Sequence, residues 1–260
     1  MIKRWILCAA LFFCSPAFSN TYQSDMSDLW WNANESGWGV TVLHQQEVVF
    51  LTFFVYGPDK RPVWYTAQGS YVSQNADTSY VFNGTLYQVN GPWFAGTFNP
   101  ATVTSRAVGS MIFTTLLNSA TLFYTIDGVA VTKSLTRFTV RNNNSTGEFI
   151  GAINQTQSGC KSPYPNGIFN SSVDFSVRNS ATSFDMTVRQ SNGNSCRYVG
   201  NYSQAGRFGY SNGTYNCTGG IVGSYSVNEI EANQQGFIGR FTANDNMCSS
   251  IVGRFAAVQK

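Results

Sequence analysis

Two residues in the most distinctive stretch of the chain, Glu35 and His44, are of the types that transfer protons in hydrolases. The alternation of apolar and polar residues from 37 to 45 predicts one β-strand between them. A strand rises about 3.3 Å per residue, so their separation is roughly 30 Å. The two side chains therefore cannot share a proton-transfer site while the strand is intact. We expect Glu35 to cap a turn or pair with a base such as Arg61, and His44 to be a hydrogen-bonded structural residue.

A second pair of carboxylates, Glu229 and Glu231, is spaced i, i+2. On a regular strand both would point to one face at about 6 to 7 Å, a spacing compatible with the acid and base of a glycosidase. The alternative is a solvent-facing pair with Ile230 turned inward. A secreted hydrolase that uses Glu35 or the pair Glu229 and Glu231 is therefore kept as the alternative function.

The motifs of other common enzymes are missing from the sequence, which holds no G-x-S-x-G, no H-E-x-x-H and no P-loop. Zinc is disfavoured, because no cysteine pair has ligand spacing and His44 is the only histidine. Asn244–Asn246 has the composition of a weak calcium loop, but also of a plain turn. We therefore expect a protein that is not an enzyme and that has no catalytic residue, no metal and no cofactor.

The aromatic residues are stronger candidates for a binding site. Exposed rings on a sheet or in the mouth of a barrel stack on sugars or hold apolar ligands. The alternative is that these rings fill the core. The expected ligand is a glycan or an apolar small molecule, and the candidate contacts are Trp30, Trp31, Trp38 and Trp64.

Residues 1–19 have the three parts of a secretory signal peptide: a basic start, an apolar core from Trp5 to Phe13, and small residues at 17 and 19. We expect the mature chain to begin near Asn20 and to be exported, to the periplasm or outside the cell. Cys8 and Cys14 follow bulky residues, unlike lipoprotein cysteines, so no lipid anchor is expected.

Charge and hydropathy exclude some partners. Without Lys3 and Arg4, the 16 basic residues fall to 14 against 13 acidic ones, which gives no reason to expect binding to nucleic acid or to an anionic membrane by charge. The longest later apolar run, Val48–Tyr56, is about half the roughly 20 residues of a spanning helix, so no transmembrane helix is expected. An outer-membrane barrel is disfavoured, because the strands lack a long lipid-facing band and the chain ends in Lys260.

Four cysteines follow the signal peptide, an even number in an exported chain, which predicts two disulfides. All four lie after residue 158, so the two halves are expected to be built differently. The turn-rich stretch from 141 to 147 is the natural boundary. We therefore predict two domains, 20–144 and 145–260.

The pattern of the first half is almost entirely β, with short alternating runs separated by turns rich in Gly and Asn. Both faces of Val48–Tyr56 are apolar, so we expect the other half or a second copy of the chain to cover its outer face. The predicted strands are Gly37 to Gln45, Val48 to Tyr56, Val63 to Tyr71, Thr78 to Val89, Arg106 to Leu116, Thr121 to Ile126 and Val129 to Val140.

The second half repeats a glycine followed two residues later by an aromatic residue, five times between Gly200 and Phe255. The missing side chain lets a sheet curve, and the ring covers the gap. With three further predicted strands the count is about eight. An up-and-down barrel of the avidin or lipocalin kind is the expected fold, and a sandwich is the alternative.

An up-and-down barrel places all four cysteines at one rim. Neighbouring strands then favour a Cys196–Cys217 bond, and closure of the first strand against the last favours Cys160–Cys248. The two other connectivities remain open.

The stretch from Trp30 to Tyr65 resembles a module of exported proteins of Gram-negative bacteria, W-x-N-x-x-E-S-G-W-G followed by a His-Gln pair and an aromatic strand. The second half resembles the C-terminal segment that accompanies this module, with Cys196 to Tyr202, Gly213 to Cys217, Glu229 to Glu231 and Gly236 to Phe241. The resemblance implies a secreted protein without an established activity. We expect a non-enzymatic binding or interaction protein.

Overall fold

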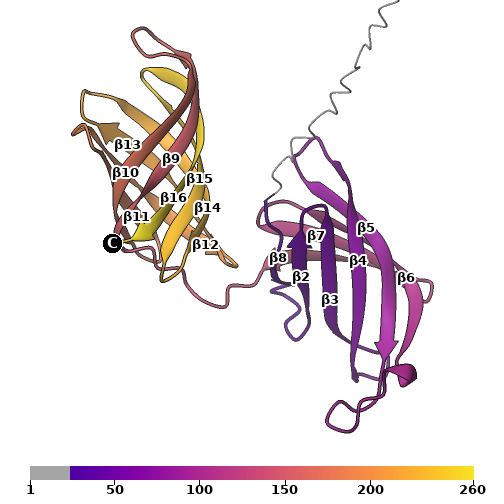
Figure 1. Ribbon diagram of the computed structural model, residues 1–260. Coiled ribbons are helices and arrows are strands. Elements are labelled where there is room, and N and C mark those ends of the chain that lie inside the picture. Colours follow the sequence, from indigo (N-terminus) through magenta and orange to yellow (C-terminus); the bar gives the residue numbers. More distant parts are fainter. Residues whose placement is uncertain (1–23) are drawn as a thin grey trace, which may run out of the picture.

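The computed structural model describes residues 24–260, which form two successive eight-stranded antiparallel barrels (Figure 1). The expected signal peptide lies outside the described residues. In each barrel every strand pairs with its neighbours in the chain, and the first strand pairs with the last. Helical structure in the described part of the chain is limited to a 3-10 turn, Pro100–Thr102. The predicted all-β class and the eight-stranded barrel in the second half are confirmed.

Barrel 1 closes through a short strand that the sequence pattern did not reveal. Strand β1 pairs with β8, with Trp30 opposite Arg137 and Trp31 opposite Thr136. Seven strands were predicted here, so the eighth converts an open meander into a barrel. The strands are β1 Asp28–Trp31, β2 Gly39–Gln45, β3 Val48–Tyr56, β4 Pro62–Gln74, β5 Tyr80–Asn90, β6 Thr104–Thr115, β7 Ser119–Ile126 and β8 Val129–Arg137.

Barrel 2 closes where β16 pairs with β9, and the Cys160–Cys248 disulfide joins these two strands. A second disulfide, Cys196–Cys217, joins β12 to β13. These are the pairs that an up-and-down topology favours. The strands are β9 Gly147–Cys160, β10 Gly167–Asn179, β11 Ser183–Gln190, β12 Ser195–Ala205, β13 Phe208–Cys217, β14 Val222–Ala232, β15 Gly236–Asp245 and β16 Cys248–Gln259.

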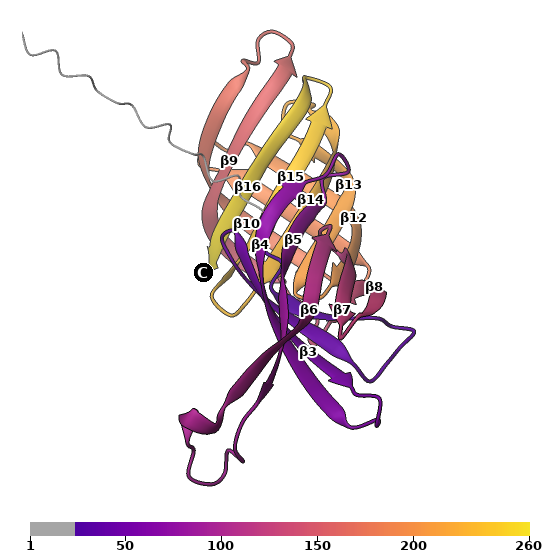
Figure 2. The ribbon, with the colours of Figure 1, turned by 90° about the vertical axis from the view of Figure 1, so that its right-hand side faces the viewer.

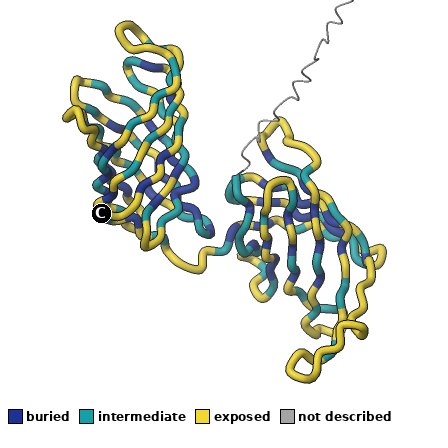
Figure 3. Tube along the Cα trace, in the orientation of Figure 1, coloured by how far each residue is buried: buried dark blue, intermediate teal, exposed yellow. Residues whose placement is uncertain are grey.

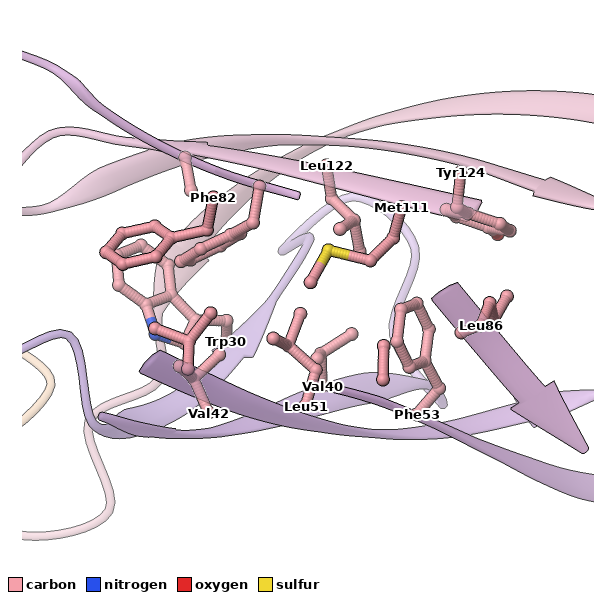
Figure 4. Close-up of a cluster of buried hydrophobic side chains, with 14 of the residues drawn as sticks. Trp30, Val40, Val42, Leu51, Phe53, Phe82, Leu86, Met111, Leu122 and Tyr124 are labelled. Atoms are coloured by element: carbon pink, nitrogen blue, oxygen red, sulfur yellow. The ribbon is translucent and has the colours of Figure 1, made fainter. Parts of the chain in front are cut away.

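Both barrel interiors are packed with side chains. In barrel 1 the inward residues of every strand meet in one apolar cluster, which includes Leu51, Phe53, Phe82, Met111 and Leu122 (Figure 4). In barrel 2 the interior is aromatic, and a cavity of about 20 Å³ remains between the rings. That space suits about one water molecule. Neither interior is therefore a chamber of the lipocalin type.

The repeated glycine and aromatic residue of barrel 2 cover one another across strands rather than within one strand. Gly239 lies opposite Phe255, and Phe241 lies opposite Gly253. A Cβ atom on Gly239 would come within 2.4 Å of the Phe255 ring, and one on Gly253 within 2.5 Å of the Phe241 ring. Each ring thus occupies the space left by the glycine on the neighbouring strand.

The junction between the barrels is built around a buried arginine. Arg137, at the end of β8, has no exposed side-chain surface and forms an ion pair with Asp28. Its guanidinium lies 4.7 Å from the ring centre of Trp30 and 4.9 Å from that of Phe208. Phe208 comes from barrel 2, so the β12–β13 turn covers the end of barrel 1. The connecting segment 138–146 joins the two barrels (Figure 1) and contacts the same turn, since the Gly206 N–H donates to Thr139 Oγ1.

Candidate functional site

The tryptophans predicted as ligand contacts do not form one surface. Trp30 is fully buried, its Nε1 donates a hydrogen bond to the Met26 carbonyl at 3.0 Å, and its ring meets Phe113 edge-on. Its position is therefore that of a core residue.

Trp38 lies half-buried at the distal end of barrel 1, the end away from the junction. Its Nε1 donates to Oε2 of Glu35 at 3.1 Å, and Lys133 Nζ lies 2.6 Å from the same oxygen. The hydrogen bond from Lys133 lowers the pKa of Glu35, so this carboxylate is ionised at neutral pH. The expected partner Arg61 was wrong, because Arg61 lies beside Asp59 instead.

Trp64 lies on the outer face of barrel 1, directly opposite Phe54 on the neighbouring strand. The two residues are 51% and 53% exposed. Tyr56 is also exposed, and its hydroxyl donates to the Gly37 carbonyl at 3.0 Å, which fixes its ring. The expectation that the other half of the chain covers this face was wrong, because the described residues of barrel 2 leave it open to solvent (Figure 3).

Trp31 lines a groove of about 480 Å³ on the outside of barrel 1, and its ring packs edge-on against Phe138. The floor consists of two rows of residues that face one another across strands. One row is Trp31, Thr136 and Ser119, and the other is Ser134, Thr121 and Thr114. Register therefore places an indole and five hydroxyl groups side by side.

The walls of this groove, which we call the Trp31 groove, add amide and carboxylate groups. Asn32 and Asn34 follow β1, and Asp77 and Ser79 come from the β4–β5 turn. The Ser79 hydroxyl donates to Asp77 Oδ1 at 2.6 Å and its backbone N–H donates to the same oxygen at 3.0 Å. These hydrogen bonds lower the pKa of Asp77, which leaves a hydrogen-bond acceptor at the edge of a floor rich in hydroxyl groups.

Glu35 and His44 lie at opposite ends of barrel 1. His44 Nδ1 accepts a hydrogen bond from the Met26 N–H at 3.2 Å, and its ring meets Phe82 edge-on. Burial lowers the pKa of His44, so the imidazole is neutral at pH 7. The structure thus does not bring the proposed acid and base together.

Glu229 and Glu231 sit at a β-bulge, where the register of β14 shifts against β15. Glu229 has a left-handed backbone (φ 55°) and is nearly buried, 2.7 Å from Arg240 Nε. Glu231 lies 3.7 Å from Arg207 Nη1. The regular strand assumed for this pair was wrong, and each carboxylate already faces a guanidinium.

Both glutamates line a cleft of about 530 Å³ beside the junction, together with Asp25, Arg207 and Arg240. The arginines of this cleft carry no motif, and sequence reasoning missed them. These arginines come close to the two glutamates only because β14 pairs with β15 and because the N-terminal segment approaches the cleft.

Asp245, in the loop considered for calcium, closes a turn. Its Oδ1 accepts hydrogen bonds from the N–H groups of Met247 and Cys248, and its Oδ2 accepts one from the Tyr215 hydroxyl. In residues 24–260, no three His, Cys, Asp or Glu side chains gather as metal ligands.

Comparison with known proteins found no match. Neither the protein-family models, nor the curated proteins, nor the solved structures contain a counterpart with significant similarity to this chain. No helix in the described part of the chain is long and apolar enough to span a membrane. The two disulfides fit a protein that resides in an oxidising compartment.

Proposed function

We propose that this is an exported, non-enzymatic binding protein that holds an uncharged carbohydrate chain in the Trp31 groove. The observation that carries the proposal is the pair of cross-strand rows, which places the Trp31 indole beside five hydroxyl groups. A sugar presents an apolar ring face and a hydroxyl edge, and it pairs with an aromatic ring on one side and polar groups on the other.

The groove suits an uncharged ligand better than an acidic one. Asp77 is its charged residue, and a carboxylate accepts hydrogen bonds from sugar hydroxyls while it repels anions. An extended chain fits better than a compact molecule, because the groove is lined by residues of β1, β6, β7 and β8 and so crosses several strands.

The alternative, a secreted hydrolase, has weaker support. A general acid needs a raised pKa, whereas the pKa of Glu35 is lowered. Glu229 and Glu231 each already face an arginine as an ion-pair partner, which leaves neither carboxylate free to act on a substrate. Activity on a polysaccharide that Glu229→Gln abolishes without a change in Tm would favour this alternative.

The test is calorimetry and affinity electrophoresis against neutral polysaccharides, with Trp31→Ala as the variant. Loss of one stacking ring costs about 1 to 1.5 kcal/mol, or about tenfold in Kd. Thr121→Val removes a floor hydroxyl at nearly constant shape and is expected to weaken binding also. Trp64→Ala is the matched control, since Trp64 is exposed on the same barrel but lies outside the groove. Equal losses in Trp31→Ala and Trp64→Ala would contradict the assignment of the groove.

A further inference from the structure

The β5–β6 hairpin extends past the distal end of barrel 1 as an arm, residues 91–103 (Figure 2). Trp93 is 76% exposed, Phe94 is 85% exposed and Phe98 is 54% exposed, all three on this arm. Soluble proteins seldom leave such rings together in water, because each buries a large apolar area when it finds a partner. The exposed rings of the arm therefore indicate a contact with a partner outside the chain.

The chain around these rings carries no charge. From 78 to 105, every residue is apolar, glycine, proline or an uncharged polar type. A segment without any charge can enter the boundary between lipid headgroups and acyl chains without burying a charge, and tryptophan and phenylalanine are favoured there.

Four backbone N–H groups of the arm have hydrogen-bond partners within the arm, which lowers the cost of moving this part of the backbone out of water. Thr102 and Val103 donate to the carbonyls of Asn99 and Pro100, at 3.1 Å each, and Gly96 donates to the Trp93 carbonyl. The Ala101 N–H donates to the Asn99 side chain. Pro92 and Pro100 have no N–H to satisfy.

Basic residues lie at the same end of the barrel. Lys60 and Arg61 form the turn between β3 and β4, and Tyr65 of β4 pairs with Gln88 near the end of β5, so this turn and the arm share one rim. Arg61 is almost fully exposed, and its Nε lies 3.7 Å from Oδ2 of Asp59 in the same turn, so Lys60 supplies the net positive charge. Such side chains lie at the level of phosphate groups when neighbouring aromatic residues enter a bilayer.

We propose that the arm inserts Trp93, Phe94 and Phe98 into the surface of a phospholipid bilayer, with Lys60 and Arg61 toward the headgroups. The contact is peripheral and reversible, because three rings bury too little area for permanent anchoring. It does not depend on the carbohydrate groove, since Trp31 and the arm belong to different strands.

The experiment is flotation of the protein, with both disulfides formed, on vesicles of phosphatidylcholine and phosphatidylglycerol. Phe94→Ser with Phe98→Ser is expected to lower the bound fraction at least about tenfold, because both rings lose their partition into the bilayer. Brominated lipid chains are expected to quench tryptophan fluorescence in the native protein. Trp93→Phe is expected to retain binding and lose that quenching.

Phe50→Ser is the matched control, since Phe50 is exposed on barrel 1 but lies toward the other end of β3. An unchanged Tm in the arm variants separates loss of binding from loss of folding. No binding of the native protein to vesicles, or an equal loss in Phe50→Ser, would overturn the proposal. Vesicle binding that survives the double substitution would also overturn it.

Discussion

Replacement of Arg137 by methionine is expected to destabilise barrel 1 by about 3 to 5 kcal/mol, the usual cost of removing one partner of a buried ion pair. The guanidinium donates to the carbonyls of Leu117 at 2.7 Å and Asp25 at 2.8 Å, and to the Asp28 carboxylate at 3.1 Å. Methionine fills a similar volume but donates no hydrogen bond. The carbonyls lose their donors, and Asp28 keeps a charge in a site that is largely closed to water.

Two hydrogen bonds that remain at Asp28 limit the loss of stability. The backbone N–H groups of Leu29 and Arg207 still donate to its carboxylate, at 3.0 and 3.1 Å. We therefore expect the loss of stability in Arg137→Met to fall in the lower half of the range of about 3 to 5 kcal/mol. Adding Asp28→Asn to Arg137→Met is expected to recover at least about 1 kcal/mol, because the unpaired charge disappears.

The tryptophans provide the assay. All of them precede residue 141, so tryptophan fluorescence during urea unfolding reports on barrel 1, whereas circular dichroism reports on both barrels. Phe208→Ala lies in barrel 2, yet it is expected to shift the fluorescence transition because the ring covers Arg137. Arg189→Met on the exposed face of β11 is the control. A loss below about 1 kcal/mol in Arg137→Met would refute the reasoning, since a buried charge would then have been left unpaired at no cost.

Two further measurements test other parts of the structure. Replacing Cys160 and Cys248 by serine opens an 88-residue loop, and replacing Cys196 and Cys217 opens a 21-residue loop. The chain-entropy estimate predicts that the free energy of unfolding in urea falls by about 4.6 kcal/mol in the first variant and by about 3.3 kcal/mol in the second. A larger loss from the shorter loop would contradict that account. Since burial lowers the pKa of His44, the unfolded chain binds this proton more tightly, and stability is expected to be constant above about pH 6.5 and to fall as pH drops below that value. His44→Gln is expected to flatten this part of a Tm profile between pH 5 and 8, and an unchanged slope would assign it to other groups.

Barrel 2 was predictable because its signal is local and repeated. Five of its strands carry their own glycine and ring, so the spacing of these strands and the need for curvature follow from one stretch of sequence. What the pattern could not provide is the partner of each ring. Gly239 and Phe255 meet through strand register, which is set by the whole sheet.

The closing strand of barrel 1 was missed for the opposite reason. Four residues are too few to show alternation, and the pairing of Trp30 with Arg137 joins positions more than 100 residues apart. The same long-range closure buries Trp30 and leaves Trp31 at the edge of the groove. Two adjacent tryptophans therefore look equivalent in the sequence and differ completely in the structure.

A signal for the bulge at Glu229 was present in the sequence. Val227 and Ile230 are both apolar, although residues three apart point to opposite faces of a regular strand, and the structure buries both. An extra residue between them restores both to the interior, and Glu229 takes the left-handed conformation of that insertion. Such conformations cost about 1 to 3 kcal/mol in residues other than glycine, and the ion pair with Arg240 offsets part of this strain.

Packed interiors explain why the candidate sites lie on the outside of the barrels. A lipocalin-like barrel binds its ligand within, and there the size and polarity of the chamber decide the specificity. Here rings and aliphatic side chains fill both interiors, so the sheets supply stability and strand register. Register in turn places side chains of distant sequence positions in cross-strand rows on the outer face, with neighbouring strands about 4.8 Å apart, and this is how Trp31 comes to lie beside Thr136 and Ser119. A change of register by one residue would turn these groups inward, so the rigidity of the packed core is what preserves the outer surface.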